Sequence, residues 1–141
     1  MPRITYPLQA EVATETIQLL QELVHLRSFN SAGYEVDMGD HVTAWLAAVG
    51  QTFTRQVVVG PRTNNVGWLP GTGDRPALVR CARLDTEPPV ETPRSVDPFA
   101  VELLDSWLHG HGTADTKDSL AAMLTAVRRY AGLVDQVFWS H

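Results

Sequence analysis

Hydrophobic residues recur every three or four positions in two stretches near the start of the chain, as in helices with one buried face. In residues 9–27 and 36–49 these stripes are Val12, Thr16, Leu19, Leu20, Leu23 and Leu26, then Val42, Trp45, Leu46 and Val49. Turn-forming residues 28–33 separate the two stretches, and Gly50 follows the second where a glycine commonly ends a helix. The chain is therefore predicted to begin with two helices.

After Gly50 the hydrophobic spacing changes and β-branched residues become frequent, which favours extended strands. Strands are predicted over residues 52–59, 64–69 and 77–82. The last two flank residues 70–74, whose proline and glycines favour a tight reversal, so they are predicted to pair as a hairpin.

Prolines concentrate in residues 83–98 and favour a long irregular loop, because proline donates no hydrogen bond to a sheet. A third helix is predicted over residues 117–131 and a last strand over residues 136–140. This order of elements predicts an α/β fold in which helices cover a mixed sheet.

The composition indicates one domain spanning residues 1–141, since 44% of the 141 residues are hydrophobic and a chain of this length buries a sizeable core. The 11 basic residues are scattered and outnumbered by 16 acidic ones, which argues against nucleic acid as a partner. A single cysteine, the lack of a signal-peptide pattern and the lack of any membrane-length hydrophobic run predict a cytoplasmic protein that does not bind membranes.

Two acidic segments, residues 83–88 and 110–117, follow or precede predicted elements at positions where α/β sheets often carry their sites. Asp85 and Asp115 are the candidate functional carboxylates within them. Each also has a purely structural interpretation, because an aspartate before a helix or in a turn commonly accepts backbone hydrogen bonds.

A rebuilt metal site of other residues is a further alternative. It would use His109, His111, Cys81 and Asp115, although their spacing matches no closed zinc site. Cys81 lies in a predicted apolar strand and is expected to be a small core residue.

A series of short motifs resembles the zinc-dependent peptidases and deacylases of the M20 family, which includes acetylornithine deacetylases and succinyl-diaminopimelate desuccinylases. The resemblance runs along nearly the whole chain, and the order and spacing of the motifs make it specific. The motifs are Gly33-Tyr34-Glu35, Asn65-Val66, Leu69-Pro70-Gly71, Ala82 to Pro88, Asp97-Pro98-Phe99, Leu108 to Lys117 and Leu120-Ala121-Ala122.

The resemblance implies the first part of an α/β/α sandwich with a mixed sheet, without the family's inserted lid or dimerisation domain. It also implies zinc-dependent hydrolysis of amide or peptide bonds in small peptides or acylated amino acids. In the family, the position of Asp85 orients a histidine ligand and that of Asp115 bridges two zinc ions. Lys117 matches the lysine of the same motif and is expected to support the site, unless it is only a surface charge, and His111 replaces an arginine.

Arg83 departs from the pattern, because it stands where the family has its zinc-binding histidine. A guanidinium has no free lone pair and keeps its proton, so it does not ligate zinc. The family's glutamate pair, which supplies the general base, is not found before residue 141. We therefore expect a truncated chain that is inactive by itself.

The alternative is a non-catalytic remnant or a metal-free binding scaffold. In that case Arg83 is expected to pair with Asp85 or Asp115 and to replace the first metal electrostatically. A third hypothesis is a homo-oligomer or a complementing chain that covers the apolar edge near residues 137–139.

Overall fold

A computed structural model describes residues 9–30, 35–70, 76–90 and 97–138. It contains three helices, two separate two-stranded sheets and a short π-helical turn, η1. The helices are α1 (Gln9–His25), α2 (Glu35–Ala48) and α3 (Asp118–Phe138). The mixed α/β class is therefore confirmed, although the described residues form no continuous sandwich.

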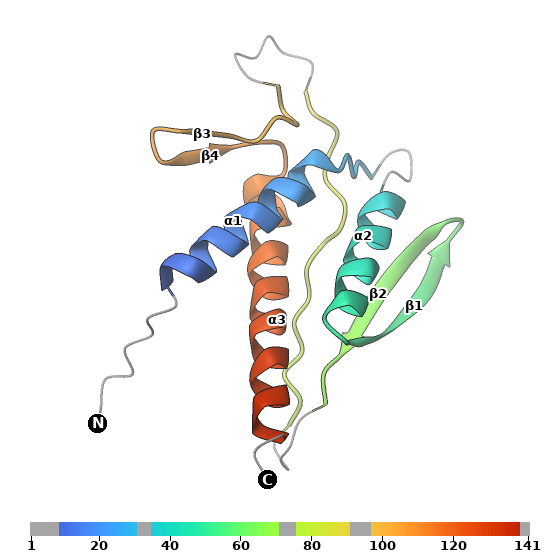
Figure 1. Cartoon of the computed structure of the whole chain (residues 1–141). Helices are drawn as coiled ribbons and strands as arrows, with labels where there is room; N and C mark the ends of the chain where they lie inside the picture. The colour runs from blue at the N-terminus through green and yellow to red at the C-terminus, as the bar shows by residue number, and fades with distance from the viewer. Residues whose placement is uncertain (1–8, 31–34, 71–75, 91–96, 139–141) are drawn as a thin grey trace.

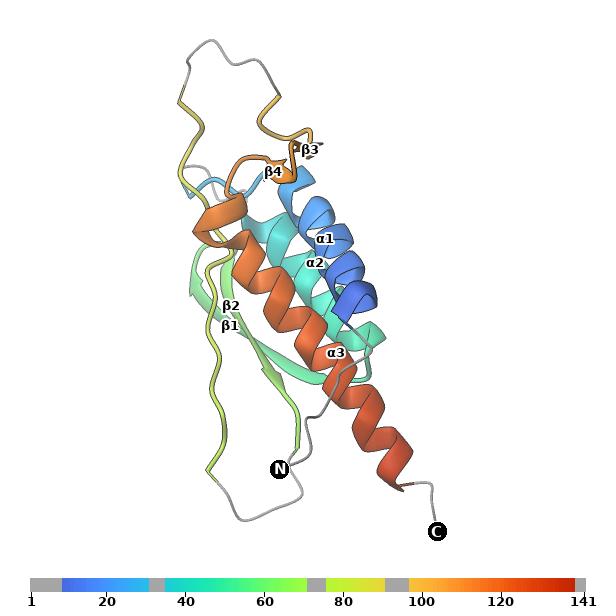
Figure 2. The same cartoon turned by 90° about the vertical axis from the view of Figure 1, so that its left-hand side faces the viewer.

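The core lies where the three helices meet (Figure 2). Leu23 of α1, Met38 of α2 and Leu120 of α3 are at most 1% exposed. Burying side chains of this size stabilises a fold by about 1.5–3 kcal/mol each. Both N-terminal helices lie where the hydrophobic spacing predicts them, because each presents its stripe to this shared core.

A hairpin of β1 (Thr52–Val59) and β2 (Arg62–Trp68) packs beside α2 (Figure 1). The reversal falls at Gly60, whose φ of 57° suits a residue without a side chain. The predicted hairpin between residues 64–69 and 77–82 is therefore wrong, since β2 pairs with the strand that precedes it through a much shorter connection.

Residues 76–85 run as extended chain that diverges from α3 toward residue 76 (Figure 2), and they have no ladder partner in the described part of the protein. Ala82 and Leu84 pack against the core, whereas Leu78 and Val79 are 78% and 85% exposed. The strand predicted over residues 77–82 is thus extended but unpaired, and Cys81 is exposed rather than in the core.

A second hairpin, β3 (Glu102–Leu104) with β4 (Trp107–His109), was not predicted. Its two turn residues, Asp105 and Ser106, have φ of 49° and 67°. Positive φ at both central residues is the pattern of a tight turn that matches strand twist. Asp-Ser is a weaker sequence signal for this turn than Asn-Gly, which explains why the sequence did not predict the β3–β4 hairpin.

The last predicted strand, residues 136–140, is wrong as far as the described residues test it, because α3 continues to Phe138. Val134, Val137 and Phe138 have the three- and four-residue spacing that continues a helical pattern. The remainder of that prediction lies outside the described residues. Among the described helices, none is long and apolar enough to cross a membrane.

Candidate functional site

Two segments, residues 83–87 and 110–117, carry the candidate functional residues and are called the site segments below. The first is held beside the chain that leaves α1. The backbone amide of Thr86 donates to the carbonyl of Ser28 at 2.8 Å, and the amide of Asn30 donates to the carbonyl of Thr86 at 3.0 Å. This short parallel bridge sets the position of Asp85 immediately before it.

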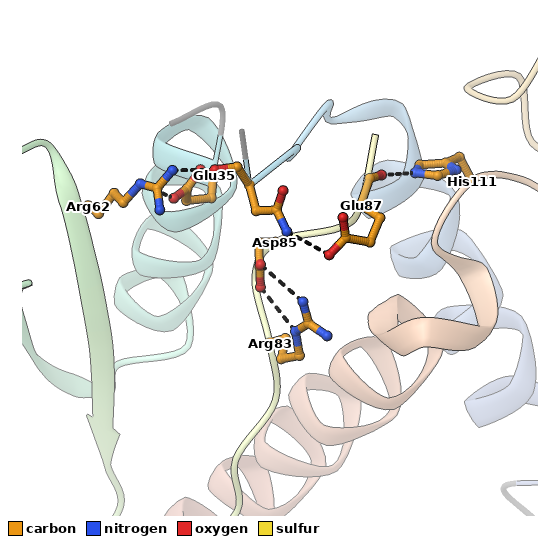
Figure 3. A network of polar contacts seen from close by, with 7 residues as sticks. Glu35, Arg62, Arg83, Asp85, Glu87 and His111 are labelled. Carbon is orange, nitrogen blue, oxygen red and sulfur yellow. Dashed lines mark hydrogen bonds and ion pairs between the residues drawn. The ribbon is translucent and has the colours of Figure 1, made fainter. Parts of the chain in front are cut away.

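Arg83 and Asp85 form a two-pronged ion pair (Figure 3). Arg83 Nε donates to Asp85 Oδ1 at 3.2 Å, and Arg83 Nη2 donates to Oδ2 at 3.1 Å. Hydrogen bonding from Arg83 lowers the pKa of the Asp85 carboxyl, and the same bond raises the pKa of Arg83. The predicted pairing of Arg83 with a neighbouring carboxylate is therefore confirmed for Asp85.

Asp115 lies in η1 (Thr113–Lys117), the turn that precedes α3. Its φ of −136° and ψ of 89° are not helical. Asp115 stands three positions before Asp118, the first residue of α3, and so is not at the N-cap position, whereas Asp118 accepts the amide of Ser119. The charge of Asp115 contributes to the raised pKa of Arg83, which places the two site segments within electrostatic reach of each other.

Lys117 is buried, with only 2% of the residue exposed. Its Nζ donates to the carbonyls of Leu23 at 2.9 Å and Leu26 at 2.8 Å, in the last turn of α1 and just beyond it. Burial lowers the pKa of the ammonium group to about 8. The interpretation of Lys117 as a surface charge is therefore wrong, and its side chain is a structural tie between the second site segment and α1.

His111 links the site to the loop that follows Thr86. Its Nε2 lies 2.6 Å from the carbonyl oxygen of Glu87, which only accepts hydrogen bonds, so this nitrogen carries the proton. The ring also packs edge-on against Phe29 and Phe99, with centroids 6.0 and 5.9 Å away. These contacts make His111 a packing and hydrogen-bonding residue in the described structure.

A polar chain that the sequence did not reveal runs from α2 to the first site segment (Figure 3). Arg62 Nε lies 2.8 Å from Glu35 Oε1, and Arg62 also donates to the carbonyl of Asn30. The Asn30 side chain then donates to Glu87 Oε1 at 2.8 Å. Glu35 lies in the Gly33-Tyr34-Glu35 motif, and this motif was the only sequence signal for these contacts.

The donor set does not fit the zinc site that the resemblance implies. Arg83 occupies the position of a ligand and engages both oxygens of Asp85. No three His, Cys, Asp or Glu side chains gather as a possible metal site within the described ranges. The alternative set of His109, His111, Cys81 and Asp115 is accordingly not brought together there.

Sequence comparison reveals similarity to a class of deacylating hydrolases, although no family model matches the chain. It is 36% identical over 123 residues to a succinyl-diaminopimelate desuccinylase of Leptothrix cholodnii, covering 82% of this chain and 31% of that protein. It is 54% identical over 35 residues to one from Ruthia magnifica, covering 25% of this chain and 9% of that protein. The resemblance to the M20 family is therefore confirmed, and the chain spans less than a third of the length of these relatives.

Proposed function

We propose that this chain is a metal-free version of the N-terminal M20 scaffold, in which the guanidinium of Arg83 takes the place of the first metal. The observation that carries the proposal is the two-pronged contact of Arg83 with Asp85, at distances of 3.1 and 3.2 Å. In the family, the carboxylate at the position of Asp85 orients the zinc-binding histidine. Here it orients a fixed cation instead.

Electrostatics supports this role for Arg83. A site lined with carboxylates and lacking a dication suffers repulsion, which a nearby positive charge offsets. Asp85, Asp115 and Glu87 all raise the pKa of Arg83. Because the Arg83 side chain is 52% exposed, water and salt screen the attraction, so its effect on stability is modest. The scaffold keeps its charge balance and loses the hydrolytic chemistry.

Zinc titration of purified variants tests the proposal. Calorimetry and metal analysis after dialysis should find no stoichiometric zinc on the wild-type chain. Arg83→His should lower the stability of the metal-free protein more than Arg80→His, a matched change in the same extended segment. The proposal is overturned if Arg83→His binds zinc tightly without losing metal-free stability, or if the wild type binds zinc that Asp115→Asn abolishes.

The second candidate is the family's own activity, zinc-dependent hydrolysis of small acylated amino acids or peptides. The match to succinyl-diaminopimelate desuccinylases favours it, together with the presence of Asp85, Asp115 and Lys117 at the motif positions. The substrate class would then be succinylated amino acids. Hydrolysis of N-succinyl amino acids, measured with added zinc and lost in Asp115→Asn, would establish this candidate and overturn the metal-free one.

A homo-oligomer or a complementing chain remains our proposal for the exposed apolar residues. Leu78 and Val79 are 78% and 85% exposed, and Trp68 is 62% exposed. Extended chain with unpaired backbone groups and apolar side chains invites further strands. This proposal concerns residues 76–82 and β2, whereas the hypothesis of a covered apolar edge near residues 137–139 stays a prediction, because residue 139 lies outside the described residues.

A further inference from the structure

Residues 23–30, called the α1 end segment below, contact both site segments through main-chain atoms. From one side, Lys117 donates to the carbonyls of Leu23 and Leu26. From the other side, Thr86 exchanges backbone hydrogen bonds with Ser28 and Asn30. Leu23 and Ser28 are fully buried, so these contacts lie inside the protein.

The two site segments also contact each other. A Cβ atom placed on Gly112 would lie 2.5 Å from Thr86 Cγ2 and 3.5 Å from Lys117 Cε. A Cβ atom on Gly110 would lie 2.8 Å from Val24 Cγ1 in α1. The loop before α3 is therefore pressed against both α1 and the first site segment. Three pieces of chain that are distant in sequence close on one another around Lys117.

We propose that the α1 end segment sets the spacing between Asp85 and Asp115, and that Lys117 is the positioning residue that holds the second site segment to it. The inference goes beyond the proposed function, because it concerns how the two site segments are held together and not which cation balances their charge. Lys117 acts here as a hydrogen-bond donor and not as a nucleophile.

The chemistry of a helix end explains why a lysine suits this position. The last four carbonyls of a helix have no partner within it, and a cation near them is favoured by the helix dipole. Lysine carries three donors on a flexible stem, so one side chain serves two carbonyls. Methionine has a similar length and apolar stem but donates nothing, which makes Lys117→Met a close control for shape.

Amide hydrogen exchange of the metal-free protein tests the inference. In Lys117→Met, the amides of Thr86 and of position 117 should exchange at least tenfold faster, while the amides of the β1–β2 hairpin change less than threefold. Lys117→Arg, which keeps the donors, should restore most of the protection. The inference is overturned if protection falls equally throughout the protein, or if the Thr86 amide is unaffected.

If Lys117→Met does not fold, native-state exchange of the wild type in low urea decides the question. The amide of Thr86, bonded to Ser28, and that of Lys117, bonded to Gly112, should then open together, with protection factors within threefold and the same urea dependence. Independent opening overturns the inference. Neither measurement involves zinc or hydrolysis, so failure of the proposed function leaves this result unaffected.

Discussion

The ammonium nitrogen of Lys117 lies 2.9 Å from the carbonyl oxygen of Leu23, which joins the start of α3 to the last turn of α1. The two residues are 94 positions apart in sequence. The bond therefore closes a long loop and buries a lysine that helical spacing alone would place at a helix start. It also secures the turn that carries Asp115.

Replacing Lys117 by methionine should destabilise the protein by about 2–4 kcal/mol, since the buried carbonyl of Leu23 and the partly buried one of Leu26 lose their donor at about 1–3 kcal/mol each, while the cost of burying a charge is relieved. Urea unfolding followed by circular dichroism measures the change. Lys117→Arg should lose less stability than Lys117→Met, because arginine keeps hydrogen-bond donors at this position. A methionine variant as stable as the wild type would show that the two hydrogen bonds contribute nothing net.

The Lys117 ammonium should titrate near pH 8, because burial lowers its pKa from 10.5 to about 8. Between these values the unfolded chain binds more protons than the folded one, so this group makes the protein more stable as pH rises from about 8 to 10.5. Lys117 is the only lysine in the sequence, so its ¹³Cε resonance is assigned without ambiguity. A midpoint near 10.5 would contradict the burial.

Arg83→Met should raise the pKa of the Asp85 carboxyl, because the variant removes the hydrogen bond and the charge that lower it. The depressed pKa of Asp85 gives stability that is present above its ordinary value of 3.8 and is lost as pH falls through the folded value. The variant should therefore resist acid less than the wild type. NMR titration of the Asp85 side-chain carboxyl carbon measures its pKa, and Arg80→Met is the control.

Gly112→Ala should destabilise the protein more than Gly60→Ala. Both glycines have positive φ, 75° and 57°, which costs another residue about 1–2 kcal/mol. Only at Gly112 would the new Cβ meet another group, at 2.5 Å from Thr86 Cγ2, whereas nothing lies within 4 Å at Gly60. Thermal unfolding of both variants measures the difference, and equal losses would show that the contact with Thr86 relaxes freely.

Val79→Lys should reduce self-association if the exposed extended chain is where copies or partners meet. Val79 is 85% exposed in a segment without a described ladder partner. A charge there opposes strand addition. Sedimentation velocity over a range of concentrations measures the self-association. Leu103→Lys is the control, because Leu103 in β3 is also exposed, at 63%. A monomeric wild type at high concentration would argue against association through this segment.

The sequence by itself predicted α1, α2 and the start of α3, because helical periodicity is a local pattern and the apolar face that it marks is buried in the shared core. It also singled out Arg83, Asp85, Asp115 and Lys117, through motif spacing and the chemical unsuitability of arginine as a ligand. Charge predicted that Arg83 pairs with Asp85 or Asp115, and the structure shows that Asp85 is the partner.

Tertiary structure decided what depends on contacts between distant residues. The burial of Lys117, the bridge from Thr86 to Ser28 and the chain from Glu35 through Arg62 to Asn30 join segments that no local pattern relates. The partner of β2 was likewise a choice between the segments before and after it, and β2 pairs with β1 through the shorter connection at Gly60. Periodicity predicts which face of an element is buried, but only packing determines which backbone groups that face meets.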